Sequence, residues 1–181
     1  MQQSAPIKSP YPADSEKTTP VMVYTQNLLI RGQVITKESI RVSIWLRTQG
    51  APEYIRMKNV QIVIFGGNGP LQTQTFGEYY IPTSQVLAFH IVPPAKDEID
   101  YDETEKNRMM VPLTFLIGTF RLNGLMRISA NTDISSHLSI VKSPLVSIYE
   151  LDISNPALPT MGTLHVPMAL IRPSVVSFGC R

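Results

Sequence analysis

The chain has 181 residues, of which 43% are hydrophobic and 17% are charged, so it can bury a core and is not a disordered protein. Its formal net charge of +2 is much smaller than that of a dedicated nucleic-acid binder. A single cysteine excludes an intrachain disulfide. No apolar run approaches the roughly 20 residues of a membrane-spanning helix, and residues 1–10 lack the apolar region of a signal peptide. We therefore expect a cytoplasmic protein with no membrane span.

The first 20 residues contain four prolines among polar and charged residues. Such a composition buries too little apolar surface to offset the entropy lost on ordering. Residues 1–20 are therefore predicted to form a disordered N-terminal tail.

A strand pattern follows the tail and recurs 92 residues later. The agreement falls on alternate positions, which is typical of a strand with one buried face. The matched pairs are Leu28/Phe120, Ile30/Leu122, Gly32/Gly124 and Val34/Met126. A glycine at the same point of both strands indicates a bulge, a bend or a close approach of two backbones.

The repeat continues at the same offset into a short helical segment. Its shared apolar positions, Val42/Ile134 and Leu46/Leu138, lie four residues apart, which is helical spacing. We predict a helix of one or two turns in each copy.

A β-branched strand then follows in each copy, aligned at an offset of 84 through Ile62/Val146, Ile64/Ile148 and Phe65/Tyr149. The residues Gly66-Gly-Asn-Gly-Pro70 are expected to form a turn. Each copy closes with two further blocks, Tyr80-Ile-Pro82 with His165-Val-Pro167 and Val86–Phe89 with Val175–Phe178. We interpret the pattern as a tandem duplication.

The predicted fold is mainly β, with one short helix per repeat. Residues 21–92 form the first β-rich repeat and residues 109–181 the second. The expected architecture is two tandem small β-sheet or half-barrel units related by a pseudo-two-fold axis. Whether the repeats share one continuous core is open at this level.

Residues 93–108 separate the repeats and carry six carboxylates against three basic residues. Like charges at this density repel one another and disfavour compaction. We expect an acidic linker that is largely exposed, contributes little to the core and lies loosely across a basic face.

The order of these blocks resembles an uncharacterised family of small bacterial β-rich domains of unknown function. The blocks that carry the resemblance are an aliphatic-x-Ile-x-Gly-x-aliphatic strand, an aliphatic-Ser-x-x-Leu segment, an apolar strand, and an aliphatic-Pro pair before a Val-rich strand. The match covers about Val21–Val92 and again Pro112–Cys180, and it departs where Trp45 and Arg47 replace more polar residues. The resemblance implies a bacterial origin and this fold, and it implies no activity.

Motifs for catalysis, cofactors or metals are not found. His90, His137 and His165 are 47 and 28 residues apart, and Cys180, matched with Ile91, is expected to be a small apolar residue of the last strand. Asp133, Ser135, Ser136 and His137 are neighbours in sequence, whereas a catalytic triad needs groups from separate elements. No catalytic, cofactor-binding or metal-binding residue is predicted, and no cofactor.

The case for nucleic acid rests on basic residues of the first repeat interspersed with Tyr24, Trp45 and Tyr54. Small β-barrels bind single strands through basic grooves and stacking aromatics. The candidate residues are Arg31, Lys37, Arg41, Arg47, Arg56 and Lys58. Only Lys58 has a basic counterpart, Lys142, in the second repeat, so nucleic acid is the less favoured partner.

We therefore expect a non-catalytic tandem β-rich interaction or assembly module, whose partner is another protein or a second copy of itself. The first alternative is a small-barrel protein that binds single-stranded nucleic acid. The second is an enzyme of unrecognised type.

Overall fold

The computed structural model describes residues 16–48, 50–66, 71–96 and 98–180. The described residues form a single antiparallel sheet of ten strands with two short α-helices, so the prediction of a mainly β fold is confirmed. The strands are β1 (Glu16–Tyr24), β2 (Leu28–Lys37), β3 (Tyr54–Ile64), β4 (Gln72–Pro82), β5 (Ala88–Ile91), β6 (Arg108–Ile117), β7 (Phe120–Ser129), β8 (Val146–Ser154), β9 (Leu164–Ile171) and β10 (Ser177–Cys180). The helices are α1 (Val42–Trp45) and α2 (Ile134–Ile140), with short 3-10 helices η1 (Thr83–Gln85), η2 (Pro159–Met161) and η3 (Pro173–Val175).

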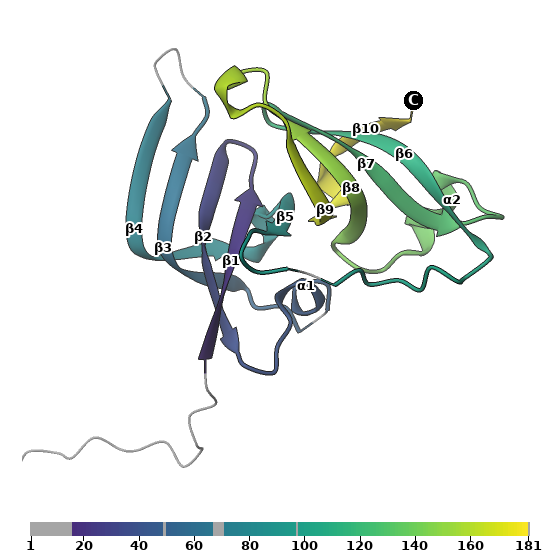
Figure 1. Cartoon of the computed structure of the whole chain (residues 1–181), viewed down its shortest axis with the longest axis horizontal. Helices are drawn as coiled ribbons and strands as arrows, with labels where there is room; N and C mark the ends of the chain where they lie inside the picture. Colours follow the sequence, from purple (N-terminus) through teal and green to yellow (C-terminus); the bar gives the residue numbers. More distant parts are fainter. Residues whose placement is uncertain (1–15, 49, 67–70, 97, 181) are drawn as a thin grey trace, which may run out of the picture.

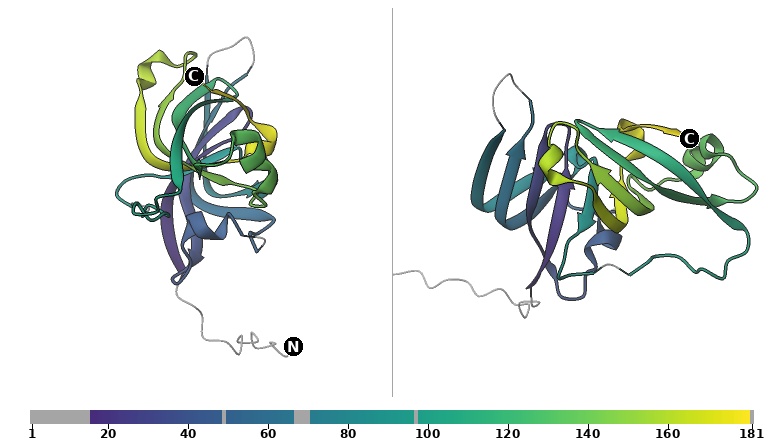
Figure 2. Two further views of the ribbon diagram at one scale, coloured as in Figure 1. Left: turned by 90° about the vertical axis from the view of Figure 1, so that its right-hand side faces the viewer. Right: turned by 45° about the horizontal axis from the view of Figure 1, so that its top comes forward.

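The strand order is β10-β6-β7-β8-β9-β5-β1-β2-β3-β4 (Figure 1). We call β1–β5 with α1 the first half and β6–β10 with α2 the second half. Within each half, the fifth strand lies beside the first strand, and the first to fourth strands lie side by side in chain order. The helix follows the second strand in both halves, and a 3-10 helix precedes the fifth strand. The strands curve strongly in both views of Figure 2.

The two halves meet where β5 pairs with β9, with Ala88 opposite Ile171 and Phe89 opposite Leu170. This pairing makes one continuous sheet, a point that the sequence left open. The alternation of side chains indicates strands but does not specify which strand edges meet.

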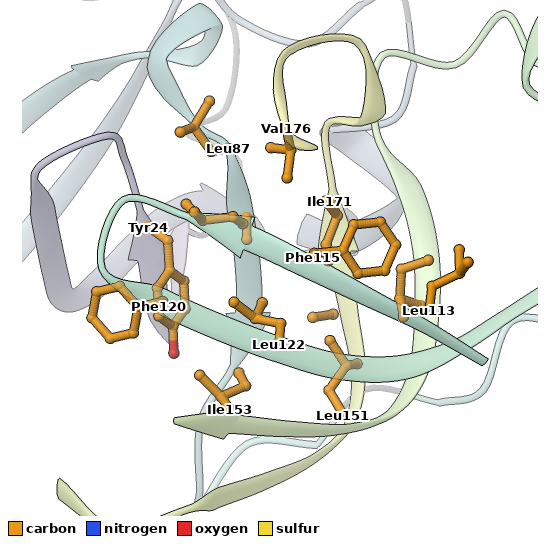
Figure 3. Close-up of a cluster of buried hydrophobic side chains, with 14 of the residues drawn as sticks. Tyr24, Leu87, Leu113, Phe115, Phe120, Leu122, Leu151, Ile153, Ile171 and Val176 are labelled. Atoms are coloured by element: carbon orange, nitrogen blue, oxygen red, sulfur yellow. The ribbon is translucent and has the colours of Figure 1, made fainter. Parts of the chain in front are cut away.

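The core also crosses from one half to the other. Tyr24 and Leu87 of the first half are buried beside Phe115 and Phe120 of the second (Figure 3). The rings of Tyr24 and Phe120 meet edge to face, with centroids 5.0 Å apart. In the opposite direction, Leu170 is buried in a cluster formed mostly by residues of the first half. Neither half therefore has a core made only of its own side chains.

The paired glycines mark bulges, as the sequence predicts. The register of β2 on β3 shifts at Gly32, and that of β7 on β8 shifts at Gly124. A Cβ on Gly32 would lie 2.9 Å from Val60 Cγ2, and one on Gly124 would lie 2.8 Å from Ile148 Cγ2. A real Cβ atom does not come this close to a neighbouring atom, so a residue larger than glycine would clash at either position. Glycine therefore lets the neighbouring strand approach closely.

The residues opposite the glycines have the same unusual backbone in both halves. Asn59 has a φ of 51° and Glu150 a φ of 48°, in the left-handed region that non-glycine residues rarely adopt. This conformation is common where an extra residue enters a bulged strand.

The strand register corrects two of the sequence alignments. Ile62 lies opposite Ile30, and Ile153 lies opposite Leu122. Since Ile30 matches Leu122, Ile62 matches Ile153, an offset of 91 where the sequence suggested 84. Alternating Ile and Val residues fit several registers equally well, and only the strand partners select one.

The fourth strands are also shifted from the predicted alignment. Ile81 lies opposite Ile55 on β3, and Ile171 lies opposite Val146 on β8, so Ile81 matches Ile171 at an offset of 90 instead of 85. The fifth strands do align as predicted, at an offset of 89, because Phe89 lies opposite Val23 and Phe178 lies opposite Phe115.

At the start of the described chain, residues 16–20 belong to β1, although the sequence assigns them to the tail. They extend the strand because β2 continues beside them, with Glu16 opposite Lys37. The remainder of the predicted tail and most of the turn at 66–70 lie outside the described residues. No described helix is both long and apolar enough to cross a membrane.

Candidate functional site

The segment between β5 and β6 binds both halves through one carboxylate. The Asp100 side chain accepts hydrogen bonds from the Tyr149 hydroxyl at 2.5 Å and the Ser147 hydroxyl at 2.7 Å, both on β8. It also pairs with Arg47, which follows α1 in the first half. The side chains of Asp100 and Arg47 are only 10% and 24% exposed. We call these four residues the Asp100 clasp.

The electrostatics of the clasp favour an ionised carboxylate. Burial alone would raise the pKa of Asp100, but the hydrogen bonds from Tyr149 and Ser147 and the positive charge of Arg47 outweigh it and lower the pKa below its usual value. Burial raises the pKa of Tyr149, and its hydrogen bond to Asp100 raises it further. Tyr149 is therefore a neutral donor to a charged acceptor.

A pocket of about 520 Å³ opens beside the clasp, between α1, β7, β8 and the segment before β6. Its basic side chains are already engaged. Arg47 binds Asp100, and Arg127 binds Glu105 at 2.8 Å while lying 4.6 Å from the centre of the Tyr101 ring. The arrangement joins the linker to both halves, and each of the three arginines that line the pocket pairs with a carboxylate, Arg108 sharing Glu105 with Arg127.

The Asp100 clasp shows that one carboxylate of the acidic linker differs from the others. Most of its carboxylates are exposed, including Glu98, Asp102 and Glu103, as the sequence predicts. Asp100 is the exception, since its side chain is largely covered and bridges the halves. The expectation of a linker that lies loosely and contributes little is therefore wrong at this residue. The acidic run predicts exposure on average, and only the fold brings Arg47 and Tyr149 to the same carboxylate.

Of the six basic residues singled out from the sequence, three are held by carboxylates. Arg41 donates to Glu98 Oε2 at 3.3 Å, and Arg47 belongs to the clasp. Arg56, on β3, pairs with Glu78 on β4 and lies 3.8 Å from Glu16. Arg41 and Arg47 line different pockets.

The other three lie on strands. Arg31 is exposed on β2 opposite Gln61, and Lys37 is exposed at the end of the same strand. Lys58, on β3, lies opposite Glu78. The six residues are thus distributed over the two ends of α1 and two strands and are not gathered around one described pocket.

The Asp133–His137 segment has a structural role at the start of α2. Asp133 is the N-cap residue, and its carboxylate accepts from the Ser136 backbone N–H at 2.7 Å and from the Ser136 hydroxyl at 3.1 Å. This is a capping arrangement, in which the side chain satisfies a free N–H of the first turn. Burial lowers the pKa of His137, which lines the pocket beside the clasp.

Among the described residues, no group of three or more histidine, cysteine or acidic side chains could hold a metal ion. His165 lies between Asp152 at 3.1 Å and Glu150 at 3.2 Å, and its hydrogen bond to Asp152 raises its pKa. Cys180 lies on β10, the last strand, as expected, and it is exposed. Its strand is outermost and leaves it uncovered.

The remaining candidate is the pair of outer strands, β4 and β10, which end the sheet of described residues. β4 has eleven residues, and its side chains from Gln72 to Glu78 are all exposed. Phe76 is 38% and Tyr80 55% exposed. Glu78 is the only charged residue of this strand.

At the other end, β10 has four residues and pairs with Leu113–Leu116 of β6. Phe178 is partly buried against Phe115, with ring centroids 5.6 Å apart, and its neighbours are exposed. We call β4 and β10 the two free edges.

The free edges were not singled out from the sequence, although a signal was present. β9 contains the continuous apolar run Met168–Ile171, which is typical of a strand covered on both faces. The matching part of β4 contains Glu78 and two tyrosines, which is typical of a strand with one open face. Comparison of the fourth strands therefore predicts which half has the exposed edge.

Comparison of the chain with protein-family models, with curated proteins and with solved structures finds no match. The function is therefore argued from the geometry of this chain.

Proposed function

We propose that this chain is a non-catalytic assembly module, built of two tandem β-rich units that lie head to tail in one sheet, and that it associates by adding strands to its free edges. The observation that carries the proposal is β4, a long outermost strand with exposed side chains and a single charge.

The physical reason is the chemistry of a strand edge. The outer side of an edge strand presents N–H and C=O groups that pair readily with another strand. Monomeric proteins usually protect such edges with short strands, several charges, prolines or bulges. β4 has eleven residues, one carboxylate and a proline only at its last position, Pro82. Its exposed aromatic rings, Phe76 and Tyr80, would gain from being covered.

The interpretation of the halves as a duplication is supported by their common strand order and by the bulges at Gly32 and Gly124. The same features agree with the resemblance to a bacterial domain family of unknown function. A non-catalytic role is supported by the described polar clusters, since the Asp100 clasp joins the halves and Asp133 caps a helix.

Sedimentation velocity over a wide range of protein concentration tests this proposal. The weight-average mass should rise with concentration, and Tyr80→Lys on β4 should suppress the rise. Ile140→Lys is the matched control, because Ile140 is 69% exposed on α2, which belongs to neither free edge. A mass equal to one chain at every concentration would overturn the proposal.

Single-stranded nucleic acid is the second candidate, favoured by one observation. Arg56 lies opposite Tyr80, and Tyr54, 51% exposed, lies two residues away on the same strand. Cations beside exposed rings suit stacked bases and phosphates. The interaction of Arg56 with Glu78 opposes this role, because the carboxylate would have to give way to phosphate.

Fluorescence anisotropy with a labelled single-stranded oligonucleotide distinguishes the two candidates. Binding at physiological salt that is lost when Arg31, Arg56 and Lys58 are changed to glutamine would favour nucleic acid. We expect only weak binding, removed by salt, that is equal in the two proteins.

A further inference from the structure

We propose that copies of this chain join head to tail, with β4 of one copy adding to β10 of the next in the same geometry that joins β9 to β5 inside each chain. The inference rests on the proposed function and names its partner, a second copy of this chain.

The first argument is the order of the strands. The internal contact joins the fourth strand of the second half, β9, to the fifth strand of the first half, β5. The strands left outermost are the fourth strand of the first half and the fifth strand of the second. The two free edges are thus the same two kinds of strand that already pair once within the chain.

The second argument is the register that follows from the internal contact. Ala88 lies opposite Ile171 and Phe89 opposite Leu170. The fifth strands match at an offset of 89 and the fourth strands at 90. These offsets place Ser177 of one copy opposite Ile81 of the next, and Phe178 opposite Tyr80.

The third argument is the exposure of these positions. Phe89 and Leu170, which are covered by the internal contact, are each 1% exposed. Their counterparts at the free edges are both aromatic, and Phe178 is only partly buried while Tyr80 is 55% exposed. Pairing of the free edges would bring these two rings together and remove them from water, which is favourable.

The contact between copies should be weaker than the contact within a chain, for an identifiable reason. Arg172, directly after β9, donates its backbone N–H to Leu87 O at 2.9 Å, and its guanidinium donates to Val86 O at 3.0 Å and Thr83 O at 2.8 Å. The residue at the matching place in the first half is Pro82, which has neither donor. Assembly should therefore dissociate on dilution, while each chain stays folded.

A contact between two different edges is heterologous, so it repeats from copy to copy and forms a ring or a filament. A contact of β4 with β4 would instead be two-fold and would stop at a dimer. The two possibilities predict different products, which makes the inference testable separately from the proposed function.

Disulfide cross-linking tests the register directly. Continuing the proposed register by two residues places Glu78 opposite Cys180, which is exposed and is the only cysteine of the chain. Under glutathione disulfide, Glu78→Cys should form a ladder of covalent oligomers. Gln74→Cys, four residues away on the same exposed strand, is the matched control and should form much less.

A second variant separates the two geometries. Adding Cys180→Ser to Glu78→Cys should abolish the ladder, because β10 then lacks its thiol. Covalent dimers that persist in the double variant would indicate pairing of β4 with β4. Equal ladders from Glu78→Cys and Gln74→Cys would also overturn the inference.

Complementation by mixing gives an independent test without oxidation. Tyr80→Lys blocks β4, and Ser177→Lys blocks β10; both positions are exposed, so the melting temperature of each variant should match the wild type. Each variant alone should have the mass of one chain at concentrations where the wild type associates. An equimolar mixture should form a complex of twice that mass and no larger species, because one intact edge of each kind remains.

The outcomes are distinct. If the wild type associates and Ser177→Lys associates equally well, the proposed function stands and the head-to-tail geometry is wrong. If the wild type is a single chain at all concentrations, both fail.

Discussion

The fourth strands of the two halves, β4 and β9, have the same place in the strand order and different surroundings. β9 lies between β8 and β5, and its Leu170 is 1% exposed, whereas β4 has β3 on one side only, and its Tyr80 is 55% exposed. At this matched pair of positions, burial follows the presence of a second neighbouring strand.

The fifth strands show the same contrast. His90 on β5 is 3% exposed and lies 3.2 Å from the Tyr24 hydroxyl, while the matching residue of β10, Gly179, is exposed. The inner strand buries a histidine at this position, and the outer strand leaves the matching position in water.

The largest expected effect is at the matched pair Leu170 and Tyr80. Leu170→Ala removes a fully buried side chain and should lower the free energy of unfolding by about 2–5 kcal/mol. Tyr80→Ala should lower it by less than about 0.5 kcal/mol, as is usual at exposed positions. Urea denaturation at a concentration where the chain is single measures both. Equal losses would contradict the distinction between the inner and outer strands.

The second prediction concerns pH and the inner strand. Burial lowers the pKa of His90 from 6.5 to about 4. The unfolded chain therefore binds the proton more tightly, so stability present above pH 6.5 is lost as the pH falls toward 4. Complete loss of this contribution would lower the free energy of unfolding by about 3 kcal/mol.

Urea denaturation as a function of pH, in wild type and His90→Gln, measures the contribution of His90 to the free energy of unfolding. The free energy of unfolding of this variant should change less between pH 6.5 and pH 4 than that of the wild type. His165→Gln is the control, because His165 is exposed and its pKa is raised, so it should leave the loss between pH 6.5 and 4 in place. Parallel curves for the wild type and His90→Gln would show that His90 is not buried as a neutral group.

The third prediction tests whether the two bulges are equivalent. A Cβ at Gly32 or Gly124 would lie within 3.0 Å of neighbouring side chains, so Gly32→Ala and Gly124→Ala should each cost about 1–3 kcal/mol. Gly77→Ala on β4 is the control, since nothing lies within 4 Å of its Cβ position. Thermal melts of the three variants measure these losses of stability. A loss at only one of the two bulges would break the equivalence of the halves.

The smallest effect is expected at the clasp that joins the halves. Asp100→Asn should lower the free energy of unfolding by about 1–2 kcal/mol, because it leaves the partly buried Arg47 without its counter-charge. Partial solvent access keeps the loss below that of a fully buried pair. Glu103→Gln, at an exposed position of the same linker, should change the melting temperature little. Identical melts would mean that the linker does not hold the halves together.

Much of the local structure is predictable from the residues themselves. The period-two pattern of β2 and β7, the glycine in each, and the four-residue spacing in α1 and α2 all depend on contacts between near neighbours. The alignment of Phe89 with Phe178 also holds, because the final strands have few alternative registers.

The registers of β3 and β4 against their counterparts were not predictable, since their alternating residues fit at offsets of 84 and 85 as well as at the observed 91 and 90. The Asp100 clasp could not be predicted from the local sequence for a different reason. Arg47, Asp100 and Tyr149 are about 50 residues apart from one another in turn, and any carboxylate of the acidic run could have served.

The sequence by itself determined the second to fifth strands of each half, the helices and the acidic character of the linker, because side-chain size and alternation act over a few residues. The first strands, β1 and β6, were not predicted. Only the tertiary structure decided that β5 pairs with β9 and that β4 and β10 stay outermost. Strand edges join through backbone N–H and C=O groups that nearly every residue has, so the choice of partner comes from the packing of the whole sheet.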